Sequence, residues 1–212
     1  MAELTDWDRR YAARSRLFHR EPDAALVELA TPLPPGRAVD LGAGEGRNSL
    51  WLAGRGWAVV AVDSSEVALS RTREAAAARG LSVQTVQEDA AAFLGRGERF
   101  HLVVVANMHP TAKDRAALLA AAAAAVAPGG HLFLIGHHLD SFGQAGPPDP
   151  ERLYTAERLR DAFPGLIVEK LERRERPGGT GGERLVEDAS SATLVDMVVW
   201  ASAPPGSEAG KP

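Results

Sequence analysis

Residues 39–48 read Val-Asp-Leu-Gly-Ala-Gly-Glu-Gly-Arg-Asn and hold the densest group of residues suited to binding a ligand. The three glycines have no side chain, so the backbone there can turn tightly and approach a ligand closely. Asp40 and Glu45 add two carboxylates, which would repel a pyrophosphate and attract a cation. The segment therefore predicts a cofactor loop for a ligand that carries positive charge. Its glycines are Gly42, Gly44 and Gly46.

A further carboxylate, Asp63, follows the apolar run 57–62 at the distance expected for binding the ribose hydroxyls of an adenosine cofactor. A dinucleotide loop requires a small residue where this chain has Arg47, so its spacing counts against NAD(P). We therefore favour S-adenosylmethionine. The simpler alternatives are a glycine turn without a ligand and an Asp63 that only caps a helix.

Two histidine-containing segments follow strand-like runs further along the chain. Residues 106–110 are Ala-Asn-Met-His-Pro, and residues 136–138 are Gly-His-His. Imidazole titrates near neutral pH, so His109 or His137 is a candidate general base. The alternative is that both are ordinary histidines lining a cleft. We expect no metal site, because no carboxylate accompanies them.

Apolar strand-like runs alternate with helical segments, which predicts an α/β fold with a parallel sheet covered on both faces. In such a sheet, ligands bind at the carboxyl ends of the strands, where Asp40, Asp63 and Asn107 would lie. Strands are expected at 37–41, 57–62, 81–86, 100–106 and 131–136, and helices at 47–55, 65–79 and 113–127.

The remaining segments complete one domain over residues 1–203. Residues 5–30 suggest two helices ahead of the sheet, within an N-terminal helical segment 1–33. A helix should begin near Thr155, and strands at 166–173 and 193–201 should form an antiparallel edge hairpin joined by the polar connector 177–191. Residues 204–212 are expected to be a disordered tail.

Composition limits the classes of partner. The formal net charge is −4 over 212 residues, and the absence of cysteine excludes disulfides and thiolate chemistry. Basic residues are scattered, so we expect no nucleic-acid partner. The start of the chain lacks the features of a secretory signal, and the apolar run 116–127 is too short to span a bilayer. The expectation is a cytoplasmic protein with no membrane segment, and its oligomeric state stays open.

Residues 39–48 and 61–65 resemble the first two motifs of class I S-adenosylmethionine-dependent methyltransferases. Residues 87–90 and 127–132 are similar to the family's acidic segment and to the turn before its fifth strand. The resemblance implies a Rossmann-like, mostly parallel sheet of seven strands with an antiparallel edge strand, with S-adenosyl-L-homocysteine as product. It implies cofactor contacts from Asp40, Gly42, Gly44, Gly46, Arg47, Asn48, Asp63, Ser64, Asp89, Ala90 and Asn107.

Residues 7–11, Trp-Asp-Arg-Arg-Tyr, and residues 46–48 are similar to the branch of tellurite-resistance and thiopurine methyltransferase-like proteins. That branch closes an N-terminal segment over the cofactor, which makes Trp7 and Tyr11 candidate lid residues; alternatively, they only pin a helix to the core. Met108 and His109 replace the Pro-Pro-aromatic sequence of enzymes that methylate nucleic-acid bases or glutamine.

The leading hypothesis is therefore methyl transfer to a small-molecule nucleophile, driven mainly by proximity. The alternatives are a non-catalytic S-adenosylmethionine sensor and an NAD(P)-dependent oxidoreductase. The identity of the acceptor is not predicted by the sequence.

Overall fold

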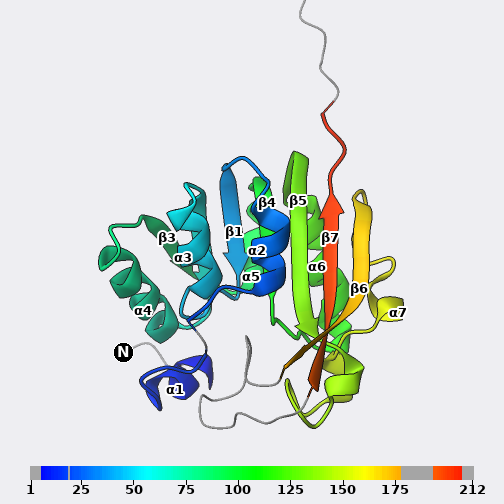
Figure 1. The fold of residues 1–212 in the computed structure, drawn as a ribbon, viewed down its shortest axis with the longest axis horizontal. Coiled ribbons are helices and arrows are strands. Elements are labelled where there is room, and N and C mark those ends of the chain that lie inside the picture. Colours follow the sequence, from blue (N-terminus) through cyan, green and yellow to red (C-terminus); the bar gives the residue numbers. More distant parts are fainter. Residues whose placement is uncertain (1–5, 19, 178–192, 207–212) are drawn as a thin grey trace, which may run out of the picture.

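The computed structural model describes residues 6–18, 20–177 and 193–206, and its centre is one seven-stranded sheet in the order β3-β2-β1-β4-β5-β7-β6 (Figure 1). The predicted α/β class and the number of strands are confirmed. The strands are β1 (Arg37–Leu41), β2 (Ala58–Asp63), β3 (Val83–Gln87), β4 (Phe100–Ala106), β5 (Val126–His137), β6 (Ile167–Pro177) and β7 (Thr193–Ser202).

Strands β1 to β5 pair in parallel, whereas β7 runs antiparallel between β5 and β6. The predicted antiparallel hairpin at the edge is thereby confirmed. Its connector was expected at 177–191 and falls almost wholly outside the described residues. Because the parallel strands all end at one edge, the loops that follow β1, β2, β4 and β5 meet there.

Helices cover both faces of the sheet, as predicted. One apolar cluster joins Val104 and Phe133 to the first helices, and a second joins the alternate strand residues Val103 and Leu132 to the later ones. The first face carries α2 (Ala24–Ala30), α3 (Arg47–Gly54) and α4 (Glu66–Ala77). The second face carries α5 (Ala90–Leu94), α6 (Ala112–Ala124) and α7 (Ala156–Leu159).

Some boundaries differ from prediction. Helix α6 ends at Ala124 instead of residue 127, and β5 begins at Val126 instead of residue 131. The cause is pairing, since the Phe100 N–H donates to the Ala125 carbonyl at 2.9 Å and Val126 is in register with Phe100. Helix α5 was not predicted, and it is only five residues long.

Outside the sheet, α1 (Asp6–Ala12) lies beyond the carboxyl ends of β1 and β4, next to the N-terminus of α4 (Figure 1). The loop after β5 contains two short 3₁₀ turns, Leu139–Ser141 and Pro150–Arg152. Beyond β7, the Pro204 carbonyl accepts a hydrogen bond from the Gly129 N–H at 3.1 Å. No helix among the described residues has the length and apolar character needed to cross a membrane.

Candidate active site

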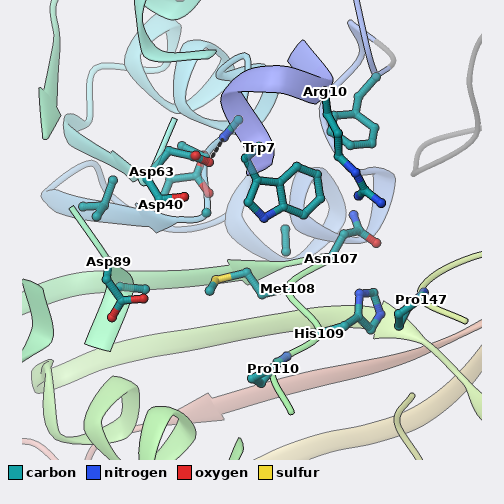
Figure 2. A pocket seen from close by; sticks show the side chains of 18 of the residues that line it. Trp7, Arg10, Asp40, Asp63, Asp89, Asn107, Met108, His109, Pro110 and Pro147 are labelled. Atoms are coloured by element: carbon teal, nitrogen blue, oxygen red, sulfur yellow. Dashed lines mark hydrogen bonds between the residues drawn. The ribbon is translucent and has the colours of Figure 1, made fainter. Parts of the chain in front are cut away.

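A cavity of about 1040 Å³ opens where the strands end, between α1 and the loops that follow β1, β2 and β4 (Figure 2). It gathers nearly all residues that the sequence nominated, from segments far apart along the chain. Gly46 and His137 are the exceptions. The nominated residues that line the cavity are Trp7, Tyr11, Asp40, Gly42, Gly44, Arg47, Asn48, Asp63, Ser64, Asp89, Ala90, Asn107 and His109.

The glycine loop needs glycine for two different reasons. Gly44 has φ +55°, and a Cβ there would lie 2.6 Å from the Tyr11 hydroxyl. Gly46 has φ +77°, and a Cβ there would lie 2.5 Å from the Thr72 side chain in α4. Both positions are in the left-handed region that side chains disfavour. Gly44 therefore lets the Tyr11 hydroxyl of α1 approach the loop closely. Gly46 packs the loop against α4 and does not line the cavity, which corrects its predicted role as a direct contact.

Asp63 ends β2 and is bound by the backbone on both sides. Its Oδ2 accepts from the Gly44 N–H at 2.8 Å (Figure 2), and its Oδ1 accepts from the Ser65 N–H, also at 2.8 Å. Burial raises the pKa of Asp63 above its ordinary value, while these hydrogen bonds oppose the rise. A carboxylate has about four acceptor sites, so Asp63 fixes the glycine loop and retains capacity for the hydroxyls of a ribose.

Asp40 lies one residue before the end of β1, and it is a buried carboxylate that lines the cavity. Its Oδ2 accepts a hydrogen bond from the Ser49 hydroxyl at 2.6 Å. Burial raises its pKa to about 6, against the hydrogen bond from Ser49 and the charge of Arg47. A cation brought next to Asp40 would lower that pKa again, because it stabilises the ionised carboxylate.

The contacts of Glu45 differ from the prediction, in which Glu45 and Asp40 together attract the positive charge of the ligand. Its Oε1 binds Arg71 of α4 at 2.9 Å, and its Oε2 accepts from the backbone N–H groups of Leu17 and Phe18 at 3.0 and 3.2 Å. Arg71 therefore neutralises Glu45, which fastens the N-terminal segment to the loop. Asp40 is the carboxylate left to attract a cationic ligand.

The adenosine end of the predicted site lies at the third strand. Asp89 lines the cavity, but its Oδ1 accepts from the N–H groups of Ala91 and Ala92 at 2.9 and 3.2 Å and so caps α5. Asp89 was predicted to bind adenine, and its role as the cap of α5 was not predicted. Because a carboxylate can accept several hydrogen bonds, capping and adenine binding are compatible.

Two polar side chains in the middle of the cavity test the fit of a methionine-type cofactor. Within the described residues, Arg47 Nη1 and both amide atoms of Asn107 are buried without a hydrogen-bond partner. Asn107 also has φ 56°, a left-handed conformation that asparagine tolerates better than most residues. Buried unpaired polar groups are unfavourable. The carboxylate and ammonium of S-adenosylmethionine would supply partners to Arg47, Asn107 and Asp40, so these residues fit the cofactor.

His109 lines the opposite end of the cavity, and its backbone and ring are held by three neighbours. Its Nε2 accepts the backbone N–H of His137 at 3.0 Å, its carbonyl accepts from Arg152 Nε at 2.7 Å, and its ring lies 5.5 Å from that of Tyr154. Since a backbone N–H can only donate, Nε2 carries no proton, and neutral imidazole then carries its proton on Nδ1. His109 is thus built as a hydrogen-bond donor.

His137 lies behind His109 and does not line the cavity. Its ring stacks on His109 at 5.1 Å and is fully buried, with Nδ1 2.8 Å from Asp196 Oδ1. The Asp196 carboxylate also contacts Arg176, and although burial opposes it, these two partners lower the pKa of Asp196. This geometry revises the predicted base role, because His137 is placed to position His109 and not to meet a substrate.

Comparison with known proteins supports the same chemistry. Residues 38–130 match the family model of the methyltransferase domain. The fold is similar to that of a protein studied for the conversion of a disulfide bond into a thioacetal group during echinomycin biosynthesis, with 25% identity and a TM-score of 0.72 over 89% of this chain and 84% of that one. With this domain and this fold, the chain is an S-adenosylmethionine-dependent methyltransferase.

Other solved methyltransferase-like structures share the fold at lower identity. TehB from Haemophilus influenzae is 18% identical with a TM-score of 0.70, and the match covers 85% of this chain and 62% of TehB. Magnesium protoporphyrin IX methyltransferase from Synechocystis PCC 6803, solved with bound S-adenosylmethionine, is 18% identical with a TM-score of 0.57 over 84% of this chain and 75% of that one.

The residues that hold the methyltransferase's N-terminal segment in place were not predicted from the sequence. Asp8 Oδ1 accepts from the Ser65 hydroxyl at 2.7 Å, and Arg71 Nη2 donates to the carbonyls of Tyr11 and Arg14 at 2.9 and 2.7 Å. Asp8 was visible within the segment 7–11, but its partner is 57 residues away. Arg71 carried no signal, because it lies in an ordinary helical stretch.

Proposed function

We propose that this methyltransferase transfers a methyl group to a small-molecule nucleophile. The observation that carries the proposal is the continuity of the cavity, which runs from Asp63 and Asp89 past Asp40 to Asn107 and His109. Its far end is bounded by the N-terminal segment and by residues 146–148. A cavity end lined by these short segments suits a compact acceptor.

The residues of the chain bind and orient, and they leave the reactivity to the donor. When bound, S-adenosylmethionine supplies a methyl group on a positively charged sulfur. Asp63 and Asp89 would hold the adenosine, and Asp40, Arg47 and Asn107 the amino-acid end. Holding two reactants at short distance and excluding water provides most of the acceleration that an in-line displacement needs. Trp7 and Tyr11 would exclude water as lid residues.

We further propose membership of the branch of tellurite-resistance and thiopurine methyltransferase-like proteins. The Trp-Asp-Arg-Arg-Tyr segment at 7–11 and the Gly-Arg-Asn ending at 46–48 support it, and so does the structural likeness to TehB. The proposal includes a sulfur acceptor, because the 25% identical protein was studied for the conversion of a disulfide bond into a thioacetal group. Sulfur nucleophiles are good acceptors without strong activation.

Calorimetric titration with S-adenosyl-L-homocysteine tests the donor site, and a mass-spectrometric screen for methylated thiols, acids, phenols and amines tests turnover. We expect binding together with turnover of at least one acceptor class. Tight binding without any turnover would favour the sensor alternative. Binding of NAD(P) in place of the homocysteine product would favour the oxidoreductase.

A further inference from the structure

We propose that the acceptor end of the cavity binds a negatively charged acceptor, held by Arg10 and Arg152. The inference rests on the proposed methyl transfer and names the class of acceptor. The shared chemistry is an anionic nucleophile, such as a thiolate or a carboxylate, which reacts without first losing a proton.

The first observation is the convergence of two arginines. Arg10 and Arg152 both line the main cavity, and both also line a smaller hollow of about 480 Å³ next to it, as does Trp7. Arg10 stacks on Trp7, with Cζ 4.8 Å from the ring, and in the close view its guanidinium is directed toward the side that holds Asn107 and His109 (Figure 2). Two positive charges therefore face the same end of the cavity.

The second observation is that these charges are not neutralised. Among the described residues, neither Arg10 nor Arg152 has a carboxylate within 4.0 Å, and Asp6, the carboxylate that lines the smaller hollow, pairs with Arg9, which also lines it. The other carboxylate that lines this end is Asp114, which is exposed and accepts the Thr111 hydroxyl at 2.6 Å. A negative charge on the acceptor would neutralise these two arginines.

The third observation concerns protons. His109 Nε2 accepts the His137 N–H, so the lone pair of this nitrogen is already engaged and cannot take a proton from an acceptor. Guanidinium groups only donate. An end of the cavity that presents donors suits an acceptor that arrives already deprotonated, and it gives a poor site for removing a proton from an alcohol or an ammonium group.

The reaction then balances without a base. The anionic acceptor atom supplies the electron pair for the new bond to the methyl carbon, and the bond between methyl and sulfur breaks with its electrons on sulfur. Opposite charges on acceptor and donor cancel, and both products are uncharged at the reacting atoms. No proton and no further reactant are required.

Three matched probes test the charge preference: benzoate, benzamide and benzamidine, which are anionic, neutral and cationic on one ring. Each is titrated calorimetrically into the full protein saturated with S-adenosyl-L-homocysteine. We expect benzoate to bind about fivefold or more tightly than benzamide, with benzamidine weakest. Equal affinities, no binding of any probe, or a preference for benzamidine would overturn the inference.

Variants test whether Arg10 and Arg152 cause the preference for benzoate. Arg10→Gln and Arg152→Gln should each weaken benzoate binding about threefold to fivefold and leave benzamide within about twofold. Arg152→Lys keeps the charge without the Nε hydrogen bond to His109, so it should retain the preference. Arg79→Gln, an exposed arginine at the end of α4 that does not line the cavity, is the matched control. Equal losses for both probes would indicate a merely structural role for the arginines.

Turnover measurements test the inference independently of binding. With benzenethiol and a less acidic alkyl thiol as acceptors, the rise of kcat/KM with pH should follow the ionisation of each thiol. A rise at one fixed pH for both would indicate a base on the enzyme and contradict the inference. The first titration, with S-adenosyl-L-homocysteine alone, separates the two proposals: its failure removes the methyl-transfer proposal, whereas success without a benzoate preference removes only this inference.

Discussion

The two ends of the cavity are built in different ways. The donor end comes from the short segments 40–48, 63–65 and 88–90 at the ends of neighbouring parallel strands, and backbone groups make many of its hydrogen bonds. The acceptor end is assembled from α1, the segment 107–111 and residues 146–152, and there the side chains of Arg152 and Tyr154 are the donors, to the carbonyls of His109 and Met108.

The difference shows how one fold can keep a donor and vary its acceptor. Hydrogen bonds donated by backbone N–H groups, such as that from Gly44 to the Asp63 carboxylate, depend on the path of the chain and tolerate few substitutions. Side chains such as Arg10 and Arg152 can change without altering that path. We therefore expect substitutions at the donor end to reduce cofactor affinity strongly and those at the acceptor end to leave it almost unchanged.

The largest effect should come from Gly44→Ala. A Cβ at this position meets the Tyr11 hydroxyl and also requires a disfavoured φ, so both the loop and α1 must shift. We expect about a hundredfold loss of S-adenosyl-L-homocysteine affinity by calorimetry. Gly80→Ala is the matched control, because Gly80 has φ +64° but open space around its Cβ position. A similar loss of affinity in both variants would show that the steric argument is wrong.

Asp63→Ala should have the next largest effect. It removes the acceptor of two backbone N–H groups and the predicted partner of the ribose. Leaving such groups unpaired costs about 1–3 kcal/mol, so we expect roughly thirtyfold weaker binding of S-adenosyl-L-homocysteine and a lower free energy of unfolding. Asp63→Asn keeps an acceptor oxygen and should lose less in both measurements. An unchanged affinity in Asp63→Ala would refute the ribose assignment.

The raised pKa of Asp40 predicts that the affinity for S-adenosylmethionine depends on pH. With a pKa of about 6 in the free protein, it is ionised at pH 7, and affinity for S-adenosylmethionine should fall by up to about tenfold per pH unit below pH 6. Asp40→Asn should bind about tenfold more weakly at pH 7 and lose this dependence. Titrations at several pH values check both points, and a wild-type affinity that is flat from pH 5 to 7 would count against the role of Asp40.

The same shift has the opposite sign for stability. Since the folded-state pKa lies above the ordinary value of 3.8, the folded state favours the protonated carboxyl. This group's contribution to stability is therefore lost as pH rises from about 4 to about 6. Asp40→Asn should raise the free energy of unfolding of the ligand-free protein at pH 7, by about 1–3 kcal/mol, in chemical denaturation.

The contact between Glu45 and Arg71 joins the donor end of the cavity to the N-terminal segment. Its loss should have a smaller effect on cofactor binding. We expect Glu45→Gln and Arg71→Gln each to weaken S-adenosyl-L-homocysteine binding a few fold, and a double-mutant cycle to give about 1 kcal/mol of coupling. Arg73→Gln removes the exposed pair with Glu66 on the same helix and should change stability by less than about 1 kcal/mol. Additive effects of Glu45→Gln and Arg71→Gln would mean that the pair does not hold the N-terminal segment.

The smallest effect on cofactor affinity should come from His109→Gln, at the acceptor end. We expect S-adenosyl-L-homocysteine affinity within about twofold of wild type, because His109 lies beyond the residues proposed to hold the cofactor. Turnover should decrease without loss of its pH dependence, since His109 donates a hydrogen bond and does not remove a proton. A pH profile that becomes flat in this variant would restore the general-base hypothesis.

The sequence by itself determined the sheet, its edge hairpin and most of the donor end. Apolar runs alternating with helices specify a parallel sheet, and such a sheet brings Asp40, Asp63 and Asn107 to one edge. The glycines identified the loop because few other residues permit that backbone. These features are local, so a short stretch of chain is enough to predict them.

Only the tertiary structure decided which side chains are already engaged. It placed Glu45 against Arg71, Gly46 against Thr72 and His137 behind His109, each through a contact across 26 or more residues. It also brought Arg10 beside Arg152 at one end of the cavity. Pairing between distant side chains depends on the packed positions of whole elements, and that information is absent from any single segment.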